Sequence, residues 1–108
     1  MNYSYRVVEV RKTSTFLSWL KALRDARAVA RIAVRIDRLS LGNPGDVRPV
    51  GEGVSEMRID YGPGYRVYFV SRGREIVVLL CGGDKSSQSA DIVRAKLLAK
   101  EVWNDRRN

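Results

Sequence analysis

The sequence contains no histidine, and Cys81 is the only cysteine among its 108 residues. Without an imidazole base, catalytic systems that pair serine or cysteine with histidine are excluded. One thiol and no imidazole are also too few soft ligands for a transition-metal site, so we expect neither a metal nor another cofactor. Because Cys81 lies in an apolar run and has no partner for an internal disulfide, we expect a buried structural thiol.

Long hydrophobic segments are missing as well. No apolar run approaches the ~20 residues that a transmembrane helix requires. The N-terminal MNYSYRVVEV lacks the apolar core and the cleavage site of a signal peptide. We therefore expect a soluble cytoplasmic protein. A length of 108 residues is typical of one domain, and we expect residues 1–108 to form a single one.

Acidic residues are scarce relative to basic ones. Twenty Lys and Arg oppose twelve Asp and Glu, which gives a net charge of +8. A small domain with this charge tends to bind a polyanion. Nucleic acid is the first candidate, ahead of a membrane surface or an acidic protein. Fifteen of the basic residues are arginine, whose planar guanidinium can bind phosphate through two hydrogen bonds.

Apolar periodicity predicts an α+β fold with elements in the order β-α-α-β-β-β-α. We expect two N-terminal helices packed on a small, mainly antiparallel sheet, with one further helix at the C-terminal end. The expected strands are residues 3–10, 55–60, 65–70 and 75–81, and the expected helices are 16–25, 26–41 and 89–103. Pro49, Gly51 and Gly53 limit the segment before the second strand to an edge or bulged piece.

One segment, IVVLLCGGDKSSQSADI at residues 76–92, joins an apolar strand to the last helix through two glycines. Glycines let the backbone turn sharply at the carboxyl end of the strand. The free N–H groups of the following helix point toward the same place. Lys85 in this connection is therefore either a functional cation or an exposed loop lysine paired with Asp84.

Two segments carry a family resemblance: VSEMRIDYGPGYRVYF at 54–69 and VVLLCGGDKSSQSADIVRA at 77–95. Over roughly residues 5–103 the chain resembles the RelE/ParE superfamily of bacterial toxins, and within it the HigB-like or addiction module killer branch. The resemblance implies the toxin of a type II toxin–antitoxin module, bound by a small antitoxin, with a heterotetramer as one form of the pair. It implies no membrane or metal partner.

Most RelE-like members cleave mRNA on the ribosome without a metal, and the resemblance implies this activity here. The ribose 2′-OH attacks the adjacent phosphate and the 5′-oxygen leaves. Such a reaction needs positive charge on the phosphorane and a proton for the leaving oxygen. ParE-like members inhibit DNA gyrase instead, which is one alternative function. A nucleic-acid-binding module without chemistry is another.

The resemblance assigns catalytic roles to Arg66 and Arg58, and the place of Lys85 between a strand end and a helix N-terminus makes it the third catalytic candidate. Arg66 follows Gly-Tyr, as does the family arginine that binds the scissile phosphate. Arg58 matches the last position of a K-x-K-x-R-like pattern whose other positions fall on Val54 and Glu56. The lysine proposed as general base in better-known members is therefore absent. Lys85 is suited to proton transfer.

The residues alone leave other interpretations open for the same positions. Arg66 could form a cross-strand ion pair with Glu56, Asp60 or Glu75. Arg58 could pair with Glu56 or Asp60.

Several further side chains are expected to contact RNA. Tyr68 shares a strand face with Arg66 and would stack on a base or assist proton transfer, with a half-buried sheet tyrosine as the alternative. Arg72 and Arg74 flank a hairpin and would contact backbone phosphate. The cations of the second helix would face ribosomal RNA or form a solvated helix face, and they are Arg27, Arg31 and Arg35.

Overall fold

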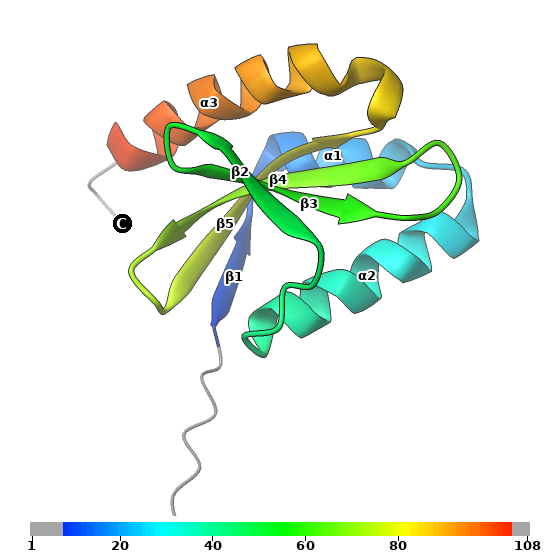
Figure 1. Cartoon of the computed structure of the whole chain (residues 1–108), viewed down its shortest axis with the longest axis horizontal. Helices are drawn as coiled ribbons and strands as arrows, with labels where there is room; N and C mark the ends of the chain where they lie inside the picture. The colour runs from blue at the N-terminus through cyan, green and yellow to red at the C-terminus, as the bar shows by residue number, and fades with distance from the viewer. Residues whose placement is uncertain (1–7, 105–108) are drawn as a thin grey trace, which may run out of the picture.

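A computed structural model of the chain describes residues 8–104, with side chains described through residue 102. It contains one five-stranded sheet in the order β1-β5-β4-β3-β2 (Figure 1). The strands are β1 (Glu9–Lys12), β2 (Val47–Gly51), β3 (Val54–Ile59), β4 (Tyr65–Arg72) and β5 (Ile76–Gly83). The helices are α1 (Ser14–Ala22), α2 (Ala26–Ser40) and α3 (Gln88–Asn104), and a 3₁₀ turn (Lys85–Ser87) precedes α3.

The predicted α+β fold is confirmed. β1 pairs with β5 in parallel, and the other strand pairs are antiparallel. Residues 3–7 of the first expected strand lie outside the described residues, and β1 begins at Glu9. None of the helices in the described part of the chain is long and apolar enough to cross a membrane.

The sheet separates two hydrophobic cores. On one face, Phe16 of α1 and Ile32 of α2 pack with Phe69 of β4. On the opposite face, Leu80 of β5 packs with Ala95 of α3. Figure 1 shows α3 along one side of the sheet and α2 along the other. β5 is thus covered on both faces, as its unbroken apolar run predicts.

Polar caps fix where the first two helices begin. The Thr13 hydroxyl accepts a hydrogen bond from Phe16 N at 3.0 Å and donates to Leu80 O at 2.7 Å, which ties the start of α1 to β5. Asp25 caps α2 by accepting from the backbone N–H groups of Arg27 and Ala28. Both caps occupy free N–H groups that the helices cannot satisfy themselves.

The segment expected to be at most an edge piece is the edge strand β2. Its pairing with β3 shifts register between Pro49 and Gly51. Proline lacks a backbone N–H, so an edge position is where it costs the sheet least. The described order is therefore β-α-α-β-β-β-β-α, with one strand more than the sequence pattern predicted.

Gly82 and Gly83 lie inside β5 and not in a turn, which corrects the expectation for this pair. Neither has a positive φ. Space is the reason for glycine here: a Cβ on Gly82 would overlap the Trp19 indole, and one on Gly83 would overlap the Asp91 carboxylate. The missing side chains let α1 and α3 approach the end of β5 from opposite faces.

We predict that Gly82→Ala destabilises the fold because the new methyl group has no room beside Trp19. Overpacking of this kind costs about 1–3 kcal/mol in the free energy of unfolding, measured by urea denaturation. Gly73→Ala is the matched control, since nothing lies within 4 Å of its Cβ position and only its φ of +61° opposes the change. A smaller loss for Gly82→Ala than for Gly73→Ala would contradict the packing argument.

Candidate functional site

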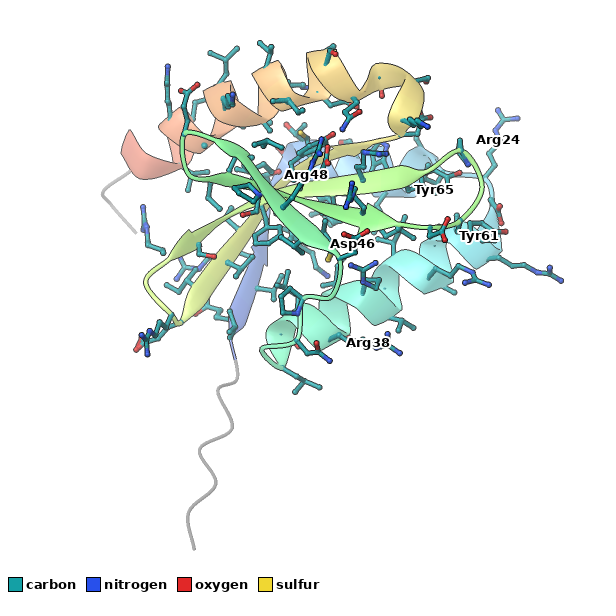
Figure 2. The ribbon with its side chains drawn as sticks, viewed as in Figure 1. Arg24, Arg38, Asp46, Arg48, Tyr61 and Tyr65 are labelled. Carbon is teal, nitrogen blue, oxygen red and sulfur yellow. The ribbon has the colours of Figure 1, made fainter. Side chains whose placement is uncertain are left out.

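Three chain connections meet at one end of the sheet (Figure 1): α1 to α2, β3 to β4, and β5 to α3. Lys85 N donates to Pro63 O at 3.4 Å, which links the β5–α3 connection to the β3–β4 turn. Tyr61 and Tyr65 lie at this end, and Arg24 extends from it (Figure 2). Predicted site residues from two distant segments of the sequence therefore lie in one region.

Arg66 and Lys85 flank Gly64. A Cβ on Gly64, whose φ is +80°, would lie 3.5 Å from Lys85 Cβ and 3.6 Å from Arg66 Nη1. Arg58 of β3 is the direct cross-strand partner of Arg66. The structure thus brings together the residues predicted to be catalytic, at the end of β3 and β4.

The Arg66 guanidinium contacts the protein through two of its nitrogens and leaves the third open. Its side chain is 11% exposed, and Nε lies 3.5 Å from Glu56 Oε2. Nη1 donates to Gly64 O at 3.1 Å. Nη2 makes no hydrogen bond with any described residue and, unlike the buried Nε, keeps contact with solvent. The ion pair with Glu56 that the residues alone suggested is present.

Lys85 is exposed and forms no ion pair with a residue in the described range. Asp84 instead caps the 3₁₀ turn, accepting from Ser86 Oγ at 2.5 Å and Ser86 N at 2.8 Å. These bonds, helped by the positive charge of Arg66, hold the pKa of Asp84 below its usual value. The Lys85 ammonium is therefore available to a ligand.

Arg58 pairs with Asp46 at 2.9 Å, and not with Glu56 or Asp60. Asp46 precedes β2 and is labelled in Figure 2. The hydrogen bond from Arg58 lowers the pKa of Asp46 and raises that of Arg58. Both side chains are well exposed, at 38% and 56%, and exposed ion pairs of this kind contribute little to stability. A phosphate could replace Asp46 at little cost.

Glu56 was missed by the sequence analysis, which placed it on the polar face of β3. It is fully buried. Its Oε2 accepts hydrogen bonds from Tyr68 Oη and Gln88 Nε2, both at 2.9 Å. Its Oε1 accepts from Arg48 Nε at 3.3 Å, and Oε2 also faces Arg66 Nε. The alternation of side chains along β3 shows that Glu56 lies on the face opposite Met57. No signal in the neighbouring sequence indicates that α3 covers this face.

The ring of Tyr68 is completely buried in the core beneath α3, so neither solvent nor a ligand can reach it. Burial and the bond to the Glu56 carboxylate raise the pKa of its hydroxyl well above the usual value. A buried ring has no free face for a base, so the structure contradicts the stacking role expected for Tyr68.

Arg72 and Arg74 lie far from Arg66. Arg66 is near the start of the eight-residue strand β4 and Arg72 ends it, which at ~3.3 Å per residue separates them by roughly 20 Å. Arg72 Nη2 donates to Val102 O at 3.1 Å. Arg74 is exposed in the β4–β5 hairpin. The structure does not bring these two arginines to the candidate site.

A groove of about 570 Å³ runs along α2 and is lined by Arg27, Ala30, Arg31, Val34, Arg35, Arg38, Ile59 and Asp60. Its arginines differ in what they can do. Arg27 is exposed, whereas the guanidinium carbon of Arg31 lies 4.7 Å from the Tyr61 ring centroid in a cation–π contact.

Arg35 has a structural position within this groove. It donates to Arg58 O at 2.5 Å, Pro44 O at 3.0 Å and Asp46 O at 3.4 Å. Its hydrogen-bonding capacity is therefore directed at the chain itself, which contradicts an RNA contact by Arg35. The other expected contacts in α2 keep open faces.

The helices and the five-stranded mixed sheet make the described part of the chain an α+β domain, consistent with a RelE-like fold. The family model described as Phage derived protein Gp49-like matches residues 18–102, and the chain belongs to this family. The family is associated with toxin–antitoxin modules. An uncharacterized protein of Haemophilus influenzae is 52% identical over 95 residues, which cover 88% of this chain and 96% of that protein.

We predict opposite behaviour for two arginines of the α2 groove. Arg35→Ala removes the guanidinium that donates hydrogen bonds to three backbone carbonyls. It should lower the free energy of unfolding by about 2 kcal/mol. Arg27→Ala, on the same helix but exposed, should change it by less than about 0.5 kcal/mol. Urea denaturation compares them, and equal losses would contradict the structural role of Arg35.

Acid should destabilise the fold through Asp25, Asp46 and Asp84, whose pKa values are all lowered from 3.8 in the folded state. For Asp25 the main cause is the hydrogen bond from Tyr61 Oη. As the pH falls, these three carboxylates take up protons in the unfolded chain before they do so in the folded protein. The stability that the charged carboxylates contribute is therefore present above pH 3.8 and is lost as the pH falls further.

The expected result is a lower Tm at about pH 3 than at about pH 5, where the unfolded carboxylates are still largely charged. Asp46→Asn should reduce the difference. Asp37→Asn, an exposed carboxylate without an ion pair to a described residue, is the control. A Tm independent of pH over this range would contradict the assignment.

Proposed function

We propose that the chain is the toxin of a type II toxin–antitoxin module of the HigB-like branch and that it cleaves mRNA on the ribosome without a metal. The observation that supports this most is the pairing of Arg66 and Lys85 around Gly64, with Arg58 opposite Arg66. Three cations at one turn form a local site for a phosphodiester, in a protein whose net charge of +8 favours nucleic acid.

In this proposal Arg66 binds the scissile phosphate. Its Nη2 is the open donor, and its other two nitrogens already contact the protein. Arg58 adds a second positive charge once the phosphate displaces Asp46. Charge that develops on the phosphorane oxygens is then met by donors that need little reorganisation.

Lys85 acts as the acid. The 2′-oxygen forms a bond to phosphorus, the bond from phosphorus to the 5′-oxygen breaks, and Lys85 gives its proton to that oxygen. The products are a cyclic 2′,3′-phosphate and a free 5′-hydroxyl. Position 56 holds a buried glutamate rather than the family's lysine, so the 2′-OH proton passes to solvent. The rate enhancement then rests mainly on electrostatic stabilisation and on orientation.

The α2 groove contributes binding rather than chemistry. Arg27 and Arg31 face ribosomal RNA, and their contacts should weaken as salt increases. A toxin of this family also implies an antitoxin partner. We propose an acidic antitoxin, because it complements the charge of the chain, and a heterotetramer as the form of the pair.

Expression of variants without an antitoxin tests the catalytic proposal. Arg66→Ala should lower cleavage by roughly 10²-fold or more, as loss of a transition-state donor does. Lys85→Ala should lower it by about 10²-fold, as loss of a general acid does. Primer extension on cellular mRNA measures the cuts, and circular dichroism verifies that the variants fold.

Arg74→Ala is the matched control, because Arg74 is exposed at the far end of β4. It should keep nearly full toxicity. Full toxicity of folded Arg66→Ala and Lys85→Ala would refute the site. Double-strand DNA breaks and an SOS response without mRNA cuts would identify gyrase inhibition instead, and normal growth with the wild type would leave only a nucleic-acid-binding module.

A further inference from the structure

A fully buried carboxylate lies beneath the candidate site. Glu56 has no exposed surface, yet it carries a charge in the core between the sheet and α3. Such a charge is costly to bury unless donors surround it. The donors around Glu56 come from β2, β4 and the first residue of α3. One side chain therefore connects four elements.

The contacts of Glu56 extend to Arg66 on the neighbouring strand. On β4, Tyr68 is the direct cross-strand partner of Glu56, and Arg66 lies two residues away on the same face. Arg66 Nε is buried and has no hydrogen-bond partner among the residues that the structure describes, but it lies 3.5 Å from Glu56 Oε2. That carboxylate is the charge that faces Nε of the guanidinium. Nη2 makes no hydrogen bond with a described residue and stays open to a ligand.

The same carboxylate also contacts the segment that carries Lys85. Glu56 Oε2 accepts from Gln88 Nε2 at 2.9 Å, and Gln88 begins α3 directly after the 3₁₀ turn that contains Lys85. Asp84 caps that turn, and Lys85 N donates to Pro63 O at 3.4 Å. Glu56 is therefore one of the contacts that hold this turn beside Gly64.

The charges around Glu56 leave the site cationic. Arg48 and Arg66 both face the carboxylate, so one negative charge opposes two positive ones. Arg48 is a residue of β2, is about half exposed, at 52%, and is labelled in Figure 2. Glu56 offsets the cost of burying the Arg66 charge. The excess positive charge still attracts an approaching phosphate.

We propose that Glu56 is a positioning residue that orients Arg66, and through Gln88 also Lys85, for the phosphate of the substrate. It does not touch the substrate, because it is fully buried. The inference rests on the proposed ribonuclease function. Position 56 is also one of the two positions, with Val54, at which the chain departs from the basic pattern of the family.

Glu56→Gln is the main test, because glutamine keeps the shape and an acceptor for Tyr68 but removes the charge that holds Arg66. With purified ribosomes and mRNA we expect kcat to fall by about 10- to 100-fold, the usual effect of a misplaced catalytic group, with little change in KM. Glu52→Gln is the matched control: it removes an exposed carboxylate of the same hairpin that faces Lys96 and Lys100, and it should keep wild-type kcat.

A double-mutant cycle separates positioning from a general structural role. Arg66→Lys lowers activity by itself but leaves enough to measure. If Glu56 acts through Arg66, adding Glu56→Gln to Arg66→Lys lowers kcat little further. Equal fold-losses in both backgrounds, or wild-type kcat for Glu56→Gln, would overturn the proposal. If Glu56→Gln fails to fold, the same cycle with Gln88→Ala decides, and wild-type kcat for that variant would overturn it.

An activity-independent measurement distinguishes this inference from the proposed function. The NMR signal of Arg66 Nε–H should be protected from solvent exchange in the wild type and lose its protection in Glu56→Gln. Unchanged protection would refute the positioning role. If the wild type cleaves no mRNA, the ribonuclease proposal fails, and the exchange measurement alone decides whether Glu56 orients Arg66.

Discussion

The buried Glu56 carboxylate is the interaction on which the α3 side of the molecule depends. Moving a carboxylate out of water costs several kcal/mol even after relaxation. The cost is offset because a phenol, an amide and two guanidinium groups face the two oxygens. These donors are in place only when β2, β3, β4 and the start of α3 are all assembled, so local opening of any one element leaves a buried charge without its partners.

The same carboxylate specifies strand register. Arg48, Glu56 and Tyr68 are direct partners across three neighbouring strands. A one-residue slip of β3 would turn Glu56 toward the apolar core beneath α1 and α2 and turn Met57 away from it. Such a slip would bury the Glu56 carboxylate without its donors on one face, and on the other it would place Met57 among donors that it cannot satisfy. Register at the candidate site is thus set by an electrostatic constraint as well as by hydrophobic alternation.

Much of the fold could be predicted from the sequence because its signals are local. The end of α2 near Leu41 and the strand expected over residues 55–60 each depend on neighbouring residues, and each appears in the structure. The conformation of Gly82 and Gly83 was predicted wrongly, because the need for glycine there comes from Trp19 and Asp91 in other elements. The edge strand β2 was underrated for the same reason, since its pairing with β3 is a tertiary fact.

The candidate site divides in the same way. Strand alternation correctly placed Arg66 and Tyr68 on one face, but it could not show that α3 covers most of that face and leaves only its end open. Burial therefore reversed the role expected for Tyr68 and concealed that of Glu56. In α2, equal spacing made the arginines look equivalent. The loop before β2 makes Arg35 different, because its carbonyls take the guanidinium's hydrogen bonds.

These differences divide the cations of the chain into two kinds with different physics. Exposed arginines such as Arg27 act over long distances and are screened at physiological salt, so they suit encounter with a large polyanion. Arg66 is 11% exposed and fixed by a buried carboxylate, so its field is screened less and its donors need little reorganisation. In the proposed function, a guanidinium held in this way keeps one phosphate in one orientation, which an exposed and screened cation does not do.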